Sequence, residues 1–188
     1  MKARKWPKRI FILIISMVFL FIAFFAVGYI LPADWKVERS TFIKAKPQQI
    51  YPLIANFKTG WPQWSAFDFE DPSIQYSYSG PLEGVGATRS WVSQKMGDGS
   101  QTILWALPDS GIEFQLSMNN GFLLNGRIAF QDVGGETKVT WMDYGKVDPN
   151  PIHRYMASVM DKMMGSAFEK SLSTLKAKAE SPSGPRTR

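Results

Sequence analysis

The sequence predicts an α+β protein in which a curved antiparallel sheet of about seven strands wraps on a long C-terminal helix, preceded by one N-terminal transmembrane helix. Three observations predict it. An uncharged apolar run occupies residues 10–31, short strand-like segments separated by glycine-rich turns lie between residues 74 and 144, and apolar residues recur with a helical period beyond Pro149. With 188 residues, the chain is long enough for one domain with appendages and too short for two full domains.

The positive charge is concentrated at the N-terminus. Of 22 basic residues, five lie in residues 1–9, a segment without acidic residues; this leaves 17 basic against 16 acidic residues, or +1, for the remainder of a chain whose net charge is +6. A DNA- or RNA-binding domain needs a basic face on the domain itself, so the charge distribution argues against a nucleic-acid partner. Because the chain has no cysteine, disulfides, thiolate metal sites and cysteine nucleophiles are excluded.

Residues 10–31 form the predicted transmembrane helix. The segment carries no charged side chain, and at about 1.5 Å rise per residue it is long enough to cross a hydrocarbon core of about 30 Å. Basic residues precede it and Asp34 follows it, so the positive-inside rule predicts that residues 1–9 are a cytoplasmic tail. For a bacterial protein, this means a single pass through the inner (cytoplasmic) membrane with the domain periplasmic or extracytoplasmic.

A cleaved signal peptide is the alternative interpretation of the same segment. Both begin with a basic stretch followed by an apolar run, and Ala26-Val27-Gly28 weakly resembles a cleavage site. The apolar run, however, exceeds the usual length of about 7 to 15 residues, which favours a retained anchor. In either case the domain is exported.

Residues 35–180 form the predicted domain. It begins with a strand at 35–44, then a short helix with Pro47 in its first turn and a tighter turn at Trp61-Pro62-Gln63-Trp64. Glycine-rich turns separate the strands that follow, as expected for an antiparallel meander. These six predicted strands are residues 74–79, 87–93, 100–106, 112–118, 126–131 and 137–144.

A long amphipathic helix is predicted beyond Pro149, with Asn150 as the N-cap and Pro151 at the first helical position. Such a helix must bury its apolar stripe, and the apolar face of the sheet is the surface available to it. The polar residues 181–188 are predicted to be disordered. The apolar positions of the helix are Ile152, Tyr155, Met156, Val159, Met160, Met163, Met164, Ala167, Phe168, Leu172 and Leu175.

Five segments carry a family resemblance. They are Val37-Glu38-Arg39-Ser40, Trp61-Pro62-Gln63-Trp64-Ser65, Tyr76-Ser77-Tyr78-Ser79-Gly80-Pro81 with Gly84-Val85-Gly86, Thr137-Lys138-Val139-Thr140-Trp141, and Phe168-Glu169-Lys170-Ser171-Leu172. In this order they resemble the polyketide cyclase/dehydrase-type branch of the SRPBCC (START-like) superfamily, particularly its membrane-anchored bacterial members. The resemblance implies a helix-grip fold with a cavity for a lipid, polyketide or other apolar molecule. It does not imply a reaction, because one fold serves many functions.

Aromatic and methionine side chains are the candidates for the lining of such a cavity. Methionine repacks around ligands of varied shape, although the same side chains also fill ordinary cores. Trp61 and Trp64 fit a cavity mouth, the bilayer interface or a hydrophobic plug equally well. The residues predicted to contact the ligand are Trp91, Trp105, Phe114, Met118, Phe130 and Met142 from the strands, and Tyr155, Val159, Met160 and Met163 from the helix.

Residues for proton transfer are few. Asp143, Tyr144 and His153 are weak catalytic candidates, with Arg89 and Arg127 on neighbouring predicted strands as possible carbonyl-polarising groups. Exposed charges on a sheet and a solvent-exposed or capping histidine explain them more simply. Strand parity alone leaves open which of them point inward. A single histidine without a carboxylate cluster at ligand spacing predicts no metal site, and no cofactor is predicted.

Three functions remain open from the sequence. The leading hypothesis is a non-enzymatic, membrane-tethered binding domain whose partners are the bilayer and a hydrophobic small molecule or lipid. The first alternative is a cyclase/dehydratase-type enzyme acting on an apolar or polyketide-like substrate. The second is an envelope protein-interaction module, whose protein partner the sequence does not identify.

Overall fold

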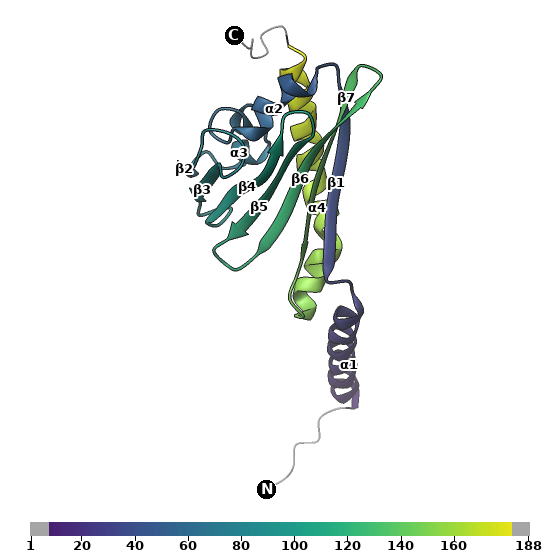
Figure 1. The fold of residues 1–188 in the computed structure, drawn as a ribbon. Coiled ribbons are helices and arrows are strands. Elements are labelled where there is room, and N and C mark those ends of the chain that lie inside the picture. Colours follow the sequence, from purple (N-terminus) through teal and green to yellow (C-terminus); the bar gives the residue numbers. More distant parts are fainter. Residues whose placement is uncertain (1–7, 182–188) are drawn as a thin grey trace.

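The computed structural model describes residues 8–181, without the side chain of Glu70. The rest of the two predicted tails, 1–7 and 182–188, lies outside the described residues. Figure 1 shows an N-terminal helix, α1 (Lys8–Ile30), below a domain made of one sheet and a long C-terminal helix, α4 (Pro151–Ala179). The sheet has seven strands, and the predicted α+β fold class is confirmed.

The sheet is an open antiparallel meander in which the first strand, β1, forms one edge. Its order is β1-β7-β6-β5-β4-β3-β2, so β1 pairs with β7 although three helical segments and five strands separate them in the chain. At the β6–β7 turn, Gly134 and Gly135 both have positive φ, as a two-residue hairpin loop requires. The strands are β1 (Asp34–Ile43), β2 (Gln75–Ser79), β3 (Thr88–Val92), β4 (Gly99–Leu107), β5 (Gly111–Met118), β6 (Leu123–Val133) and β7 (Glu136–Lys146).

Three short helices between β1 and β2 close one end of the domain. They are α2 (Pro47–Ala55), the 3-10 helix η1 (Trp61–Gln63) and α3 (Phe67–Glu70). The indole Nε1 of Trp61 donates to the carbonyl oxygen of Ile54 at 2.6 Å, and that of Trp64 donates to Leu53 at 2.8 Å. Both side chains are buried and satisfy carbonyls at the end of α2 that lack a helical partner. Trp61 and Trp64 therefore pack inside the domain rather than against the bilayer interface, and Trp61 also lines a cavity.

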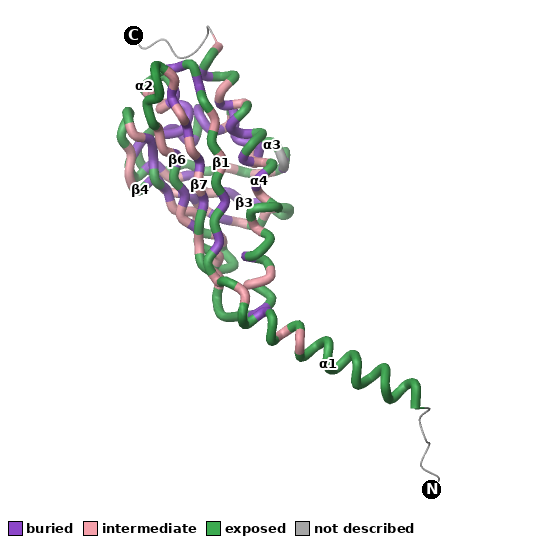
Figure 2. The backbone as a smooth tube through the Cα atoms, turned by 90° about the vertical axis from the view of Figure 1, so that its right-hand side faces the viewer, coloured by how far each residue is buried: buried purple, intermediate pink, exposed green. Residues whose placement is uncertain are grey.

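Helix α4 begins at the predicted residue. The Asn150 side chain accepts a hydrogen bond from the backbone N–H of Ile152 at 3.0 Å, and Pro151 occupies the first turn. The helix packs along β1 and covers the concave face of the sheet. Figure 2 shows buried residues gathered in the upper part of the domain, whereas α1 is mostly exposed.

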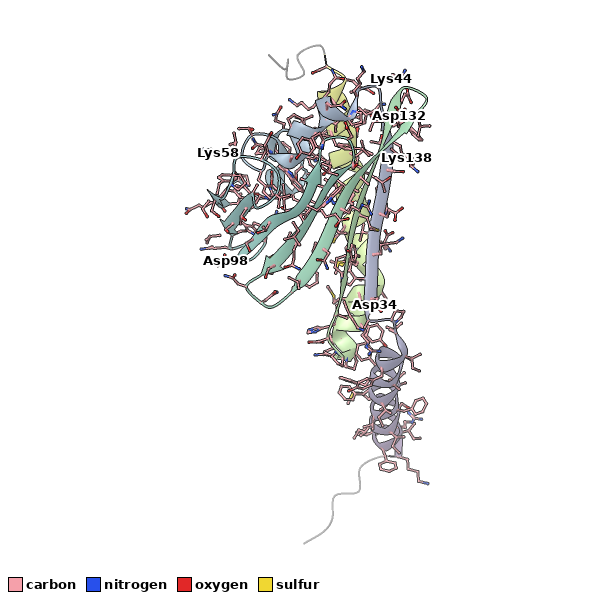
Figure 3. The ribbon with its side chains drawn as sticks, in the orientation of Figure 1. Asp34, Lys44, Lys58, Asp98, Asp132 and Lys138 are labelled. Atoms are coloured by element: carbon pink, nitrogen blue, oxygen red, sulfur yellow. The ribbon has the colours of Figure 1, made fainter. Side chains whose placement is uncertain are left out.

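Helix α1 meets the domain through the first turns of α4. Arg154 Nη1 donates to the carbonyl oxygens of Tyr29 at 2.7 Å and Leu31 at 3.0 Å, at the C-terminal end of α1. The Tyr155 ring stacks on Phe24 with 4.5 Å between ring centroids, and its hydroxyl donates to the Phe24 carbonyl. Helix α1 is long and apolar enough to cross a membrane, although a signal sequence near an N-terminus has the same character. In Figure 3, Asp34 marks the lower end of the domain, next to α1.

Candidate functional site

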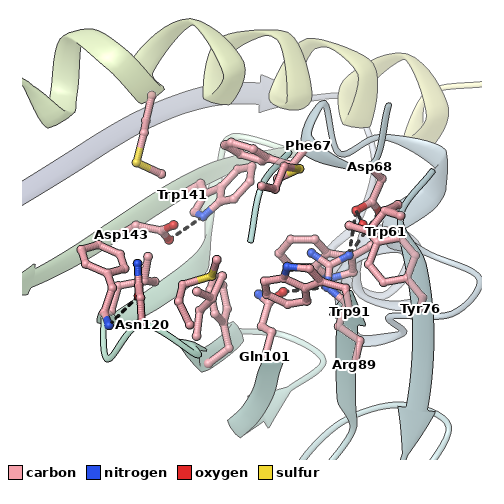
Figure 4. Close-up of a pocket in the computed structure, with 18 residues that line it drawn as sticks. Trp61, Phe67, Asp68, Tyr76, Arg89, Trp91, Gln101, Asn120, Trp141 and Asp143 are labelled. Carbon is pink, nitrogen blue, oxygen red and sulfur yellow. Dashed lines mark hydrogen bonds and ion pairs between the residues drawn. The ribbon is translucent and has the colours of Figure 1, made fainter. Parts of the chain in front are cut away.

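A cavity of about 320 Å³ lies between the concave face of the sheet and α4 (Figure 4). Its volume is at the lower end of the range of about 300–1,000 Å³ that is common for small-molecule sites. Most of the lining is aromatic, aliphatic or methionine. The apolar residues are Trp61, Phe67, Ile74, Trp91, Met96, Phe114, Leu116, Met118, Phe122, Leu124, Trp141 and Met164, and the polar ones are Asp68, Tyr76, Arg89, Gln101, Asn120 and Asp143.

Arg89 and Asp68 form a neutral pair at one end of the cavity. Arg89 Nη1 donates to both carboxylate oxygens of Asp68, at 2.9 and 3.2 Å, and its Nε donates to Gln101 Oε1 at 2.8 Å. The guanidinium also lies 4.5 Å from the Trp61 ring centroid, a favourable cation–π distance. Because both charged side chains are almost fully buried, the pair serves to join α3 to β3 and β4.

Tyr76 completes this network from the edge strand β2. Its hydroxyl donates to Asp68 Oδ1 at 2.8 Å. Burial, reinforced by the negative charge of Asp68, raises the pKa of Tyr76 well above its usual value, which keeps the hydroxyl as a donor. Asp68 thus receives hydrogen bonds from two side chains, and the Arg89 charge has its counter-ion within the protein.

Asp143 is the other ionisable group in the cavity, and its surroundings are apolar. It lies on β7, and its Oδ1 accepts a hydrogen bond from Trp141 Nε1 at 2.8 Å (Figure 4). Burial raises the pKa of Asp143 to about 7, and the Trp141 hydrogen bond offsets the effect of burial only in part. A carboxyl group that is part protonated at neutral pH can accept or donate a proton, or hydrogen-bond to a ligand.

Glycine at position 126 makes space for Asp143. Gly126 is the β6 residue paired with Asp143 of β7 and with Phe114 of β5. A Cβ atom at this position would lie 2.6 Å from Asp143 Oδ1 and would collide with the Phe114 ring. Any larger residue would therefore displace the carboxyl group or the aromatic wall of the cavity.

Some of the strand residues that were predicted to contact a ligand line this cavity. Trp91, Phe114 and Met118 line it, together with Asp143. Phe130 is on the same face of the sheet but packs against the core instead. Whether the lining residues contact a ligand remains a prediction.

Three predicted strand residues lie on the outer face of the sheet. Met142 and Tyr144 flank Asp143 with the opposite parity and line a surface groove. Trp105 has the same parity as the buried Ile103, so alternation alone would place it on the inner face. The β4–β5 pairing is irregular between these two residues, however, and this turns Trp105 to the outer face, where it pairs with the exposed Glu113. These three side chains do not reach the cavity.

Of the other polar candidates, Arg89 points into the cavity, whereas Arg127 and His153 do not. Arg127 lies on the outer face, 3.6 Å from Glu113, whereas Arg89 points inward. His153 is exposed in the first turn of α4, where its Nδ1 lies 2.7 Å from Asp148 Oδ1. Among the residues that the structure describes, no three histidine, aspartate or glutamate side chains form a group that could hold a metal ion.

The helix residues predicted to line the cavity face several directions. Met164, rather than Met163, lines the cavity, while Val159 and Met163 are exposed. Tyr155 packs against α1. Met160 lies in a second groove near α1, which shares Asn120 and Phe122 with the cavity; its other residues are Gly121, Leu123, Lys146, Val147, Asp148, His153 and Met156.

Sequence reasoning did not single out several of the polar lining residues. Gln101 had a usable signal, because it shares its strand parity with Ile103 and both are buried on the inner face. Asp68 and Asn120 lie outside the strands, where no periodicity indicates direction. Phe122 is also in a turn, and its ring stacks on Trp35 with 5.8 Å between centroids.

Comparison with known proteins identifies the family. Residues 34–180 match the family described as polyketide cyclase / dehydrase and lipid transport. The chain belongs to this family. A search of curated proteins gave no match.

Solved structures share the fold of this polyketide cyclase-type domain. A Staphylococcus aureus protein of unknown function is 13% identical, with a TM-score of 0.61, 79% of this chain and 95% of that chain covered. A norcoclaurine synthase point mutant from Thalictrum, in complex with a transition-state analogue, is 12% identical with a TM-score of 0.57, covering 80% and 98%. The Aha1 dimer from Colwellia psychrerythraea is 17% identical with a TM-score of 0.52, covering 79% and 98%. At such identities the likeness establishes the helix-grip fold and no activity.

Proposed function

We propose that this protein is a non-enzymatic, membrane-tethered binding domain for a hydrophobic small molecule or lipid. The observation that carries the proposal is the cavity between the sheet and α4, which is lined by aromatic, aliphatic and methionine side chains. A concave apolar site with a few polar groups is the usual form of a small-molecule site. The family description, which includes lipid transport, supports the same class of ligand.

The tether is proposed from α1 and its junction with α4. If α1 spans the inner membrane with the basic residues on the cytoplasmic side, the domain is periplasmic or extracytoplasmic. Between α1 and β1 only residues 31–33 intervene, and Arg154 and Tyr155 hold the end of α1 against α4. The domain would then stay at the bilayer surface, where a high local concentration of lipid makes modest affinity sufficient.

Native mass spectrometry of protein purified from its own membrane tests the binding proposal. The intact chain is expressed, residues 32–188 are released at an engineered protease site, and the bound molecule is extracted with solvent. We expect an additional mass that is extractable as an apolar molecule. Leu116→Trp, which adds volume inside the cavity, should abolish this mass, whereas Leu104→Trp on the exposed face of β4 should retain it. An apo mass from a protein that also takes up no added apolar probe would contradict the proposal.

A cyclase/dehydratase-type enzyme is the second candidate, and Asp143 favours it. The pKa of this buried carboxyl group, raised to about 7 by desolvation, suits general acid–base chemistry on an apolar substrate. Asp143→Asn keeps the shape of the side chain and removes its proton-transfer ability. Turnover of an apolar carbonyl substrate that Asp143→Asn reduces by about 100-fold or more would favour the enzyme. Turnover unchanged in Asp143→Asn would remove Asp143 from the reaction.

A further inference from the structure

Asp143 has fewer hydrogen-bond partners than its chemistry allows. A carboxylate offers about four acceptor positions, and the structure describes one donor to Asp143, the Trp141 indole at 2.8 Å. The residue is 4% exposed and lines the cavity, so any further donor must reach it from within the cavity. Burying a carboxyl group without partners costs free energy, and a donor supplied by a ligand would offset that cost.

The surrounding elements provide no compensating charge. The cross-strand neighbours of Asp143 are Val37 on β1 and Gly126 on β6, neither of which has a polar side chain. The cation that lines the same cavity, Arg89, is already paired with Asp68 and Gln101. Among the ion pairs described for residues 8–181, none includes Asp143. Within the described part of the chain, Asp143 is therefore an acidic group of the cavity without a counter-ion.

The cavity also separates its polar groups in space. Figure 4 shows Asp143 beside Trp141 and Asn120 on one side, and the Arg89–Asp68 pair beside Tyr76 on the other. Apolar walls such as Phe114, Leu116 and Met118 line the space along with them. A ligand with one polar end and one apolar body fits this distribution, with its polar end at Asp143.

We propose that Asp143 selects the ligand, so that the cavity takes an apolar molecule bearing a single hydrogen-bond-donating head group, a hydroxyl or a protonated amine. The inference rests on the proposed binding function and specifies its ligand class. The head group donates to Asp143, whose other oxygen retains the Trp141 contact. Both head groups make a charge-assisted hydrogen bond to the carboxylate, and the protonated amine also supplies the opposite charge, so the amine benefits most.

Titration of the full-length protein in dodecyl maltoside micelles tests this assignment. Nonylamine, 1-nonanol and nonane share one chain and differ in the head group, and the 15N-indole NMR signals of the tryptophans that line the cavity report binding. For each probe, comparing Asp143→Leu with the native protein cancels partition into the micelle. We expect affinity to fall by about tenfold for 1-nonanol and more for nonylamine, and to stay within about twofold for nonane.

Two variants make the outcome decisive. Asp143→Asn can retain the Trp141 contact and offers an N–H to the ligand, so it should shift preference towards methyl nonyl ether, which only accepts. Tyr144→Leu, on the exposed face of the same strand, should leave all four affinities unchanged. Equal losses for all probes in Asp143→Leu, or native preference for the ether over the alcohol, would overturn the ligand class while leaving the binding function intact. Failure of every probe to shift the indole signals would instead contradict the binding function itself.

Discussion

The two halves of α4 differ in how closely they pack against the rest of the domain. In the C-terminal half, Phe168, Leu172 and Leu175 are at most 2% exposed. In the N-terminal half, Met160 and Met164 face the domain but are only half-buried, and Met164 lines the cavity. The same helix therefore provides close packing at one end and leaves space at the other.

The aromatic cluster explains the dense half. Trp141 stacks on Phe168 with 4.0 Å between ring centroids, and Trp64 meets Trp141 edge-on at 5.4 Å. The difference teaches that close packing and open space are placed in neighbouring parts of one core, which share the Trp141 side chain. A rigid, well-packed region can support a region that is not fully packed.

Truncation in the two halves should have the largest and most different effects. Phe168→Ala removes a fully buried ring, and we expect the free energy of unfolding to fall by about 3–5 kcal/mol. Met164→Ala, at a half-buried position that lines the cavity in the other half, should lower it by less than about 2 kcal/mol. Urea denaturation of both full-length variants, followed by near-UV circular dichroism, measures the two values. Similar losses would show that α4 packs uniformly.

The pH dependence of the free energy of unfolding should reveal the buried carboxyl group of Asp143, which lines the cavity. The pKa of Asp143 is raised to about 7, whereas an aspartate in an unfolded chain titrates near about 3.9. Between these values the folded protein binds more protons than the unfolded chain, so the free energy of unfolding falls as the pH rises. Relative to Asp143→Asn, the native protein should lose up to about 4 kcal/mol between about pH 4 and pH 7.

The variant comparison isolates Asp143 from other carboxyl groups. The pKa of Asp161, for example, is lowered by its hydrogen bond to Arg39, which gives the opposite pH dependence in both proteins. Denaturation at several pH values therefore needs only the difference between native and variant curves. A difference that does not vary with pH would mean that solvent reaches Asp143.

A larger side chain should be tolerated beside the cavity and not in the closely packed part of the core. Leu116→Phe extends into the cavity, and we expect the free energy of unfolding to change by less than about 1 kcal/mol. Ile54→Phe adds volume beside the fully buried end of α2 and should cost about 1–3 kcal/mol. Thermal denaturation of the two variants compares them directly. If Leu116→Phe is as costly as Ile54→Phe, the cavity is not available space.

The junction between α1 and α4 should give the smallest effect. Arg154→Ala removes two hydrogen bonds to the carbonyls of Tyr29 and Leu31, and with them a cation at the C-terminal end of α1 that is worth about 0.3–1 kcal/mol. We expect faster protease cleavage at residues 31–33 in the full-length protein, with unchanged stability of the domain. Lys162→Ala, further along α4 and exposed, is the matched control. Equal cleavage of both variants would show that Arg154 does not restrain α1.

Particular residues show why the candidate site was only partly predictable. Strand parity left open whether Asp143 or Tyr144 points inward, because apolar residues, Trp141 and Met142, occupy both faces of β7. The prediction that Trp105 points into the cavity was wrong because the β4–β5 pairing is irregular between Ile103 and Trp105, and no sequence pattern indicates this irregularity. Met163 and Met164 are adjacent, so a helical period of about 3.6 residues left the choice between them open.

The sequence by itself determined the class of fold, the succession of the seven strands, the beginning of α4 and the apolar character of α1, because these depend on local periodicity, turn residues and capping; it did not indicate α3. Only the tertiary structure decided which strand face is concave, that Arg89 is neutralised by Asp68 from α3, and that Asp143 has no counter-ion among the residues described around the cavity. These features arise from contacts between residues distant in the chain, and no local pattern encodes them. The physical reason is that burial and charge pairing belong to the assembled core, not to any one segment.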